Sequence, residues 1–131
     1  MQEITKRERK TLLKAQQGEL DAVLMYNALA EKVKDERDKE TFKKLAAEEG
    51  GHAAVFFKLT KQTLKPKKTK AIFLPILYKV LGKKRLYPLI AKGEYDAEKN
   101  YAPVVERFPE TKSVQADEKR HGDTVKGLLE E

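Results

Sequence analysis

The chain is 131 residues long, has a net charge of +7 and contains no cysteine, which excludes disulfides, iron–sulfur clusters and thiolate metal sites within it. The length fits one domain, and a charged fraction of 37% with few glycines and prolines favours a helical protein. The N-terminal residues are charged rather than apolar, and the apolar stretch at residues 71–81 is too short to cross a bilayer. We therefore expect a cytoplasmic location.

The first helix is expected to begin near Lys6, because Thr5 and Glu8 form a capping-box pattern there. Core-facing positions then recur every three or four residues, and Glu19 and Tyr26 both fall on this stripe. They stand seven residues apart, which is about two helical turns. A glutamate on a core-facing stripe is unfavourable unless a partner offsets its charge, so Glu19 is a candidate metal ligand.

The second helix is expected over residues 38–64, after a turn marked by Asp35. Its core-facing stripe carries Glu49 and His52. The two glycines at positions 50–51 lie inside the helix, where each costs roughly 1 kcal/mol relative to alanine. We expect them to allow close approach of another helix, or to leave room for a small molecule beside His52.

Residues 65–82 are expected to connect the two halves of the chain, with a short helix from Pro75 to Gly82. Ten lysine and arginine residues and no acidic residue lie between positions 58 and 85. The favoured interpretation of this basic 58–85 segment is a solvated connection, and the alternative is contact with anionic lipid headgroups at a membrane surface. Because no recognition motif accompanies the charge, we expect no nucleic-acid partner.

The third helix is expected to begin between residues 83 and 88 and to reach about residue 107, with Pro103 kinking it or ending it early. A tight turn at residues 108–109 should lead into a fourth helix from residue 110 to the C-terminus. The core-facing stripes of these two helices again contain acids, which repeats the pattern of the first half.

The two halves of the chain share one arrangement of acids, tyrosines and histidines. Glu19 and Glu94 stand 75 residues apart, each followed seven residues later by a tyrosine, Tyr26 or Tyr101. Each half then has a Glu-x-x-His, whose two side chains share one helix face. Four such helices can hold two metal ions, whose charge the four carboxylates balance. The predicted ligands are Glu19, Glu49, His52, Glu94, Glu118 and His121.

Several neighbours of these residues allow two interpretations. Glu48 and Asp117 each lie four residues before a histidine, and we favour a solvated surface position over a role in orienting an imidazole. Tyr26 and Tyr101 are balanced between hydrogen-bonding to a ligand carboxylate and acting only as core aromatics.

With these residues, the chain resembles the ferritin-like di-iron carboxylate superfamily, and within it the rubrerythrin-like branch. The resemblance implies an all-α, ferritin-like four-helix bundle of two antiparallel hairpins, joined by a long crossover that carries a short helix. Residues 1–131 would then form a single ferritin-like di-iron domain, in which Tyr26 and Tyr101 hydrogen-bond to ligand carboxylates. The branch usually has a further glutamate three residues after the third-helix ligand, where this chain has Ala97. Glu98 is then the candidate for the extra ligand, although we favour a solvated position for it.

The function implied is that of a non-haem di-iron oxidoreductase, a peroxidase that reduces hydrogen peroxide, or oxygen, at a carboxylate-bridged site. The cofactor would be two iron ions, with manganese or zinc as alternatives. The rubredoxin-like domain of the branch is absent from this chain, so an external electron donor protein is expected. The alternative is an iron-binding module, which would be a ferroxidase, an iron sensor or an iron-delivery domain serving a membrane transporter. The sequence is also similar to the soluble ferritin-like domain found before vacuolar-iron-transporter-type membrane domains. The sequence leaves open whether the chain forms a homodimer.

Overall fold

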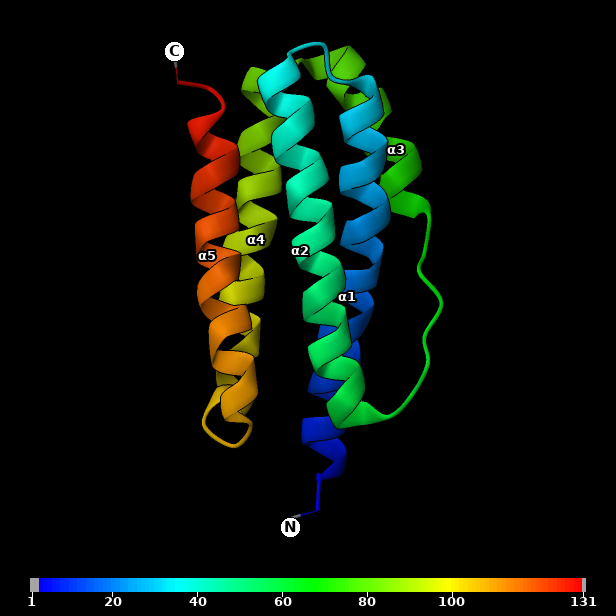
Figure 1. The fold of residues 1–131 in the computed structure, drawn as a ribbon, viewed down its shortest axis with the longest axis vertical. Helices are drawn as coiled ribbons and strands as arrows, with labels where there is room; N and C mark the ends of the chain where they lie inside the picture. Colours follow the sequence, from blue (N-terminus) through cyan, green and yellow to red (C-terminus); the bar gives the residue numbers. More distant parts are fainter. Residues whose placement is uncertain (1–2, 131) are drawn as a thin grey trace.

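Four long helices pack side by side in the computed structural model, which describes residues 3–130, and a shorter helix lies against one side of them (Figure 1). The elements are α1 (Lys6–Lys32), α2 (Glu36–Thr60), α3 (Thr69–Leu81), α4 (Lys83–Val105), the 3-10 turn η1 (Pro109–Thr111) and α5 (Lys112–Gly127). α1 and α2 form one antiparallel hairpin, and α4 and α5 form the other. The crossover returns the chain along the bundle, so α2 and α4 run parallel (Figure 1). The predicted all-α, ferritin-like bundle is confirmed.

The starts of the first two helices follow from local capping. The Thr5 hydroxyl accepts a hydrogen bond from the Glu8 amide at 3.1 Å, and the Glu8 carboxylate accepts one from the Thr5 amide at 2.9 Å. This confirms the predicted capping box. The Asp35 carboxylate accepts a hydrogen bond from the Arg37 amide at 2.8 Å, so α2 begins at Glu36, slightly before the predicted residue 38.

α2 ends at Thr60 rather than near residue 64, and a tertiary contact explains the difference. Lys61 adopts a left-handed conformation with φ of 55°, which stops the helix. The buried side chain of Gln16 on α1 holds this end. It accepts a hydrogen bond from the Thr60 hydroxyl at 2.5 Å and donates one to the carbonyl of Gln62 at 2.8 Å.

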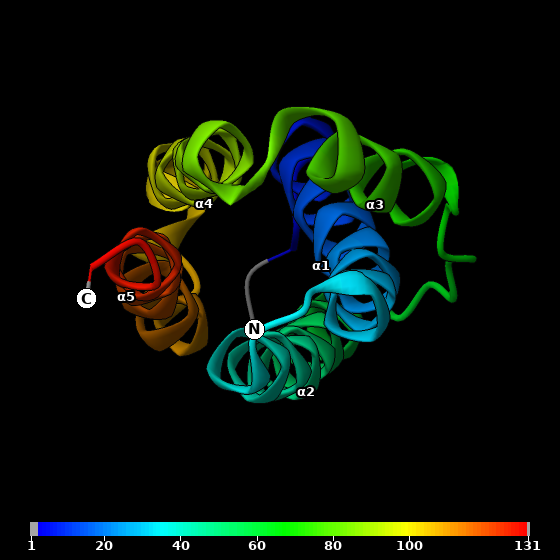
Figure 2. The same cartoon turned by 90° about the horizontal axis from the view of Figure 1, so that it is seen from above.

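The helix of the crossover is longer than predicted. α3 begins at Thr69, so Pro75 lies inside it instead of at its start. Leu74 and Leu77 pack onto the main core, and this burial outweighs the hydrogen bond that a proline removes. Gly82 alone separates α3 from α4, with a φ of 79° that favours glycine. Seen from above, α3 lies outside the four long helices, next to α1 (Figure 2).

The second hairpin differs from prediction mainly at its ends. α4 stops at residue 105, two residues after Pro103, and thus before the predicted residue 107. The 3-10 turn at 109–111 precedes α5, which ends at residue 127 and does not extend through the C-terminal residues that are described. Within residues 3–130, no helix has the length and apolar content needed to cross a membrane.

The apolar core is divided into two clusters along the bundle axis. One is built around Tyr26, Phe42 and Tyr87, and the other around Leu12, Phe56 and Val104. Along every long helix, the residues between these clusters are the acids and histidines singled out above. The core therefore fixes a polar layer in the middle of the bundle, between two apolar clusters.

Candidate metal centre

A layer of buried carboxylates and imidazoles crosses the bundle between the two apolar clusters. None of its six side chains belongs to a residue that is more than 7% exposed. All four long helices contribute, and the structure brings the six predicted ligands together: Glu19 from α1, Glu49 and His52 from α2, Glu94 from α4, and Glu118 and His121 from α5.

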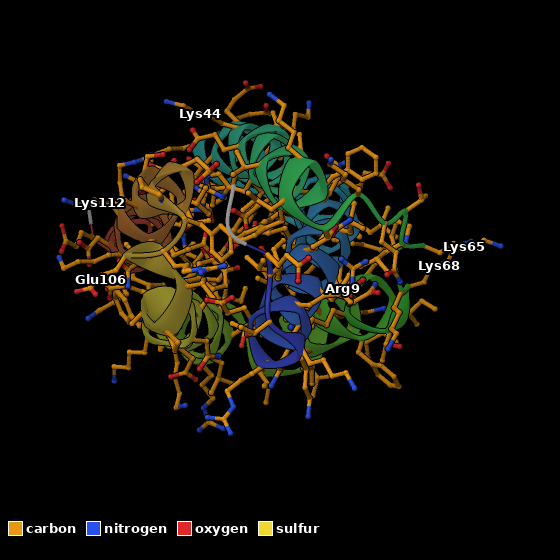
Figure 3. All side chains as sticks on the ribbon, turned by 90° about the horizontal axis from the view of Figure 1, so that it is seen from below. Arg9, Lys44, Lys65, Lys68, Glu106 and Lys112 are labelled. Atoms are coloured by element: carbon orange, nitrogen blue, oxygen red, sulfur yellow. The ribbon has the colours of Figure 1, made fainter. Side chains whose placement is uncertain are left out.

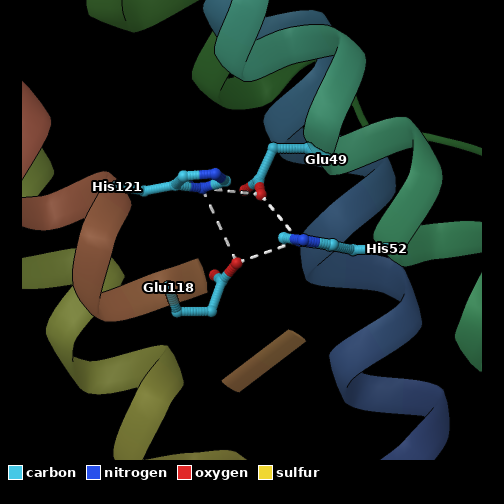
Figure 4. A group of neighbouring side chains, drawn as sticks. All are labelled: Glu49, His52, Glu118 and His121. Carbon is cyan, nitrogen blue, oxygen red and sulfur yellow. Dashed lines mark hydrogen bonds and ion pairs between the residues drawn. The ribbon is translucent and has the colours of Figure 1, made fainter. Parts of the chain in front are cut away.

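Glu49 lies between the two imidazoles. Its Oε1 atom is 3.1 Å from Nδ1 of His52 and 3.1 Å from Nδ1 of His121. Glu118 Oε1 also faces both rings, at 3.1 Å from Nδ1 of His52 and 3.8 Å from Nδ1 of His121. One ligand atom from each of these four residues lies within 4.8 Å of the others, so they enclose a single compact volume (Figure 4).

Glu19 and Glu94 each approach one imidazole. Glu19 Oε2 is 3.4 Å from Nδ1 of His52, and Glu94 Oε2 is 3.0 Å from Nδ1 of His121. The six side chains thus divide into two equivalent halves, each with one carboxylate and one imidazole of its own. The two central carboxylates are common to both halves.

The opposite nitrogen of each imidazole is held by a further acid. His52 Nε2 is 2.9 Å from Asp117 Oδ2, and His121 Nε2 is 2.9 Å from Glu48 Oε1. Partial burial opposes ionisation of these two acids, but hydrogen bonds from the imidazoles and from Arg120 lower the pKa of both. An ionised carboxylate only accepts hydrogen bonds, so each Nε2 carries a hydrogen and donates it. Each Nδ1 is then the atom that can offer a lone pair to a metal.

The sequence-based preference for solvated surface positions at Glu48 and Asp117 is therefore wrong. Glu48 on α2 reaches the histidine of α5, and Asp117 on α5 reaches the histidine of α2. Neither contacts the histidine four residues later on its own helix, which is the pairing that sequence spacing suggests. Arg120 joins the two acids, because its guanidinium donates to Glu48 and lies 3.2 Å from Asp117 Oδ1.

The two tyrosines of the repeat behave differently. The Tyr101 hydroxyl donates a hydrogen bond to Glu19 Oε1 at 2.7 Å, across 82 residues of sequence. The Tyr26 hydroxyl is buried and, among residues 3–130, has no hydrogen-bond partner. The Tyr26 ring stacks on Phe42 with 5.7 Å between ring centroids, so this tyrosine belongs to the apolar cluster. The expected bond to a carboxylate is present for Tyr101 and absent for Tyr26.

Without a metal, the cluster neutralises its charge with protons. Burial, reinforced by the neighbouring carboxylates, raises the pKa of Glu118 to about 10. Burial also raises the pKa of Glu19 and that of Glu94 to about 7. For Glu49, hydrogen bonds from both imidazoles outweigh burial and lower the pKa to about 2.

The imidazoles hold protons for the converse reason. Burial alone would lower the pKa of each, but the carboxylates around them reverse this. The pKa of His121 rises to about 11 through Glu49 and Glu94, and that of His52 rises further through Glu118 and Glu19. In the metal-free cluster, bound protons therefore balance the negative charge that metal cations would otherwise balance.

This donor set fits two metal ions. Within residues 3–130, Glu19 Oε2 and Glu118 Oε1 are buried and have no hydrogen bond of their own, because the nearest Nδ1 atom, that of His52, is hydrogen-bonded to Glu49. Buried oxygens without a hydrogen-bond donor are unfavourable, and a bound cation would satisfy them. Four carboxylates offset the charge of two divalent ions, and imidazole and carboxylate together suit iron, manganese or zinc.

Comparison of the chain with protein families gives a match to Rubrerythrin over residues 10–129. The chain belongs to the rubrerythrin family. Comparisons with curated proteins and with solved structures give no match. Family membership and the buried cluster together indicate a metal-binding bundle.

The candidate extra ligand of this rubrerythrin-family chain lies outside the cluster. Glu98 is half-buried on α4, and its backbone carbonyl accepts a hydrogen bond from Gln115. In the described part of the chain, its carboxylate forms no hydrogen bond or ion pair with any of the six predicted ligands. Glu98 follows Glu94 by four residues, whereas the usual ligand follows by three. One residue turns a helix by about 100°, so the side chain at position 98 points in another direction from the side chain at position 97.

A cavity of about 270 Å³ leads to the carboxylates from the side of α1, α3 and α4. Apolar and aromatic residues and two glycines form most of its wall, and its lining also includes the carboxylates Glu19, Glu49, Glu94 and Glu118. Gly18 and Gly93 lie beside the first ligand of each half, and both also line the adjoining surface pocket. Side chains there would narrow the passage between α1 and α4.

The glycines at 50 and 51 do not play the expected part. Both are exposed on α2. A Cβ atom at Gly51 would meet nothing within 4 Å, and one at Gly50 would come to 3.9 Å from the side chain of Val23, an ordinary contact distance. They neither allow a close helix contact nor line the cavity, so the expectation of space beside His52 is wrong. The glycines that line the cavity are instead those preceding Glu19 and Glu94. The sequence signal for them is that both occupy the same position in the repeat.

Proposed function

We propose that this chain is a non-haem di-iron oxidoreductase that reduces hydrogen peroxide. The observation that carries the proposal is the buried layer in which each imidazole Nδ1 atom faces three carboxylates, four in all. Glu19 and His52 would hold one ion, and Glu94 and His121 the other. Glu49 and Glu118 would be shared by both ions, since each faces both imidazoles.

Two bound ferrous ions would supply the two electrons, one each, that reduction of hydrogen peroxide and two protons to two waters requires. The residues of the chain do the rest. Tyr101 holds Glu19 in place through a hydrogen bond, while Asp117 and Glu48 keep the imidazoles in the tautomer that can bind metal. Reducing equivalents would come from an external electron donor protein, because this chain has no cysteine for an iron–sulfur or thiolate iron centre of its own.

The approach to the site favours a neutral reactant. Lys70 lines both the inner cavity and the adjoining surface pocket, and Lys10 and Lys14 line the surface pocket beside it. Three ammonium groups at the entrance oppose the entry of metal cations and leave uncharged peroxide unaffected. This supports a resident metal centre that meets a small oxidant, and it disfavours continuous passage of iron by this route.

The second candidate is an iron-binding module, that is, a ferroxidase, an iron sensor or an iron-delivery domain. The position of Glu98 favours it, since the carboxylate that usually completes the rubrerythrin-like site is not in the cluster. The two candidates differ in the preferred oxidant. A peroxidase oxidises its diferrous site faster with peroxide, whereas a ferroxidase favours oxygen.

The test begins with anaerobic loading of the full chain with Fe(II), for which we expect two ions per chain. A stoichiometry of one or zero would refute the di-iron assignment. Stopped-flow mixing with equal concentrations of hydrogen peroxide or oxygen then compares the rates of ferric formation. We expect peroxide to be faster, and Glu98→Gln, as a matched acid outside the cluster, to leave both rates unchanged. Faster oxidation by oxygen would select the ferroxidase.

A further inference from the structure

The outward face of α3 is apolar. Ile72, Phe73, Ile76 and Val80 are between 52% and 73% exposed, although their neighbours Leu74 and Leu77 pack onto the core. At 100° per residue these four exposed side chains form one stripe along the helix. A helix of 13 residues is about 20 Å long, so the stripe extends over several turns.

Basic residues flank this stripe along the chain, and Glu31 of α1 is an acid that lines the groove beside it. From residue 50 to residue 93 the sequence contains no aspartate or glutamate. Exposed cations lie on the segment before α3, on α3 itself and at the start of α4, namely Lys65, Lys67, Lys68, Lys70, Lys79, Lys84 and Arg85. None of these seven forms an ion pair within residues 3–130. Lys65 and Lys68 project away from the bundle beside α3 (Figure 3).

We propose that α3 and its flanking lysines dock on an anionic membrane surface. An interfacial helix places its apolar side chains at the level of the lipid headgroups while nearby basic residues contact the phosphates, and α3 has both features. The energetic reason is that water now solvates four large apolar side chains that a bilayer interface would bury. The inference does not depend on the metal centre, because its residues are not among the predicted ligands.

A second copy of the chain is a poorer occupant of this face. Two copies related by a two-fold axis would place the same lysines opposite one another, and Glu31 beside the stripe is a single acid against seven exposed cations. Anionic lipid supplies the missing negative charge. The sequence-based interpretation of this segment as a solvated connection explains the lysines, but it does not explain why four large apolar side chains of α3 are exposed.

The full chain should be tested by flotation with vesicles of phosphatidylcholine alone and of phosphatidylcholine mixed equally with phosphatidylglycerol. We expect binding to the anionic vesicles only, weakening as salt is raised. The double variant Phe73→Ser/Ile76→Ser should bind at least tenfold more weakly. Lys67→Gln/Lys68→Gln should lose about fivefold per lysine. Phe57→Ser, at a 46% exposed aromatic on α2, is the matched control and should bind normally.

Circular dichroism and metal loading of each variant would show that it remains folded. Three results would overturn the proposal: no binding to either vesicle, equal binding to both, or unchanged binding by the Phe73→Ser/Ile76→Ser variant. Sedimentation velocity on the same samples tests the alternative that two copies of the chain associate through this face. A dimer that the apolar variant abolishes, without vesicle binding by the parent chain, would make this face a self-interface.

Discussion

Loading the metal-free protein with a divalent ion should release protons, and the structure sets their number. At pH 7 both imidazoles and Glu118 are protonated, since the pKa of each lies well above 7. Glu19 and Glu94, each with a pKa of about 7, share about one proton more. Metal ligands must be deprotonated, so binding two ions should release about four protons per chain.

The sign of the pH dependence follows from the same pKa values. All the protons that must leave sit on groups with raised pKa values, so a lower pH stabilises the metal-free form and weakens binding. With about two protons released per ion, the apparent affinity for each ion should change about 100-fold per pH unit near neutrality. At pH 9 the release should fall to about three, because Glu19 and Glu94 have already lost their shared proton.

Zinc is the suitable probe, because it binds the same ligand types and has no redox chemistry that would release further protons. Titration calorimetry in buffers of different ionisation enthalpy measures the protons released at pH 7 and pH 9. Release close to zero at both values would show that the metal-free imidazoles are neutral. In that case the proton-filled cluster described above does not exist.

Three further predictions test the surroundings of the site. Asp117→Asn should weaken zinc affinity about 10- to 100-fold, because the amide no longer fixes the tautomer of the His52 imidazole. The control Glu110→Gln should leave zinc affinity unchanged. Equal affinities of the two variants in a competition titration would contradict this prediction. Tyr101→Phe should destabilise the metal-free protein by about 1–3 kcal/mol in urea unfolding, because the buried carboxylate of Glu19 loses its hydrogen-bond donor. Tyr26→Phe should be neutral or stabilising, because the Tyr26 hydroxyl is buried without a partner in the described part of the chain. The opposite order would show that the two tyrosine assignments are reversed. Gly51→Ala should stabilise the same protein by about 0.5–1 kcal/mol, since it removes an exposed helical glycine with free space around it, and a loss of stability would reveal a contact that the structure lacks.

Periodicity alone identified the four long helices and the polar layer. Glu49 and His52 are three residues apart on a stripe of apolar residues, and this spacing places both on one helix face whatever the packing. The same reasoning applies to Glu118 and His121. Local rules also located the capped start of α1 and placed that of α2 within two residues, because a capping hydrogen bond joins residues only two or three apart. Such features survive in any tertiary arrangement of the helices.

Only the tertiary structure decided which residues meet between helices. Spacing places Glu48 four residues before His52, but the rotation of α2 directs its carboxylate to His121 instead. The repeat gives the two tyrosines equivalent positions, yet only Tyr101 reaches a carboxylate, because Tyr26 stacks on Phe42. Helix rotation and separation are set by packing over the whole bundle, so sequence spacing determines the face of a side chain but not its partner on a facing helix.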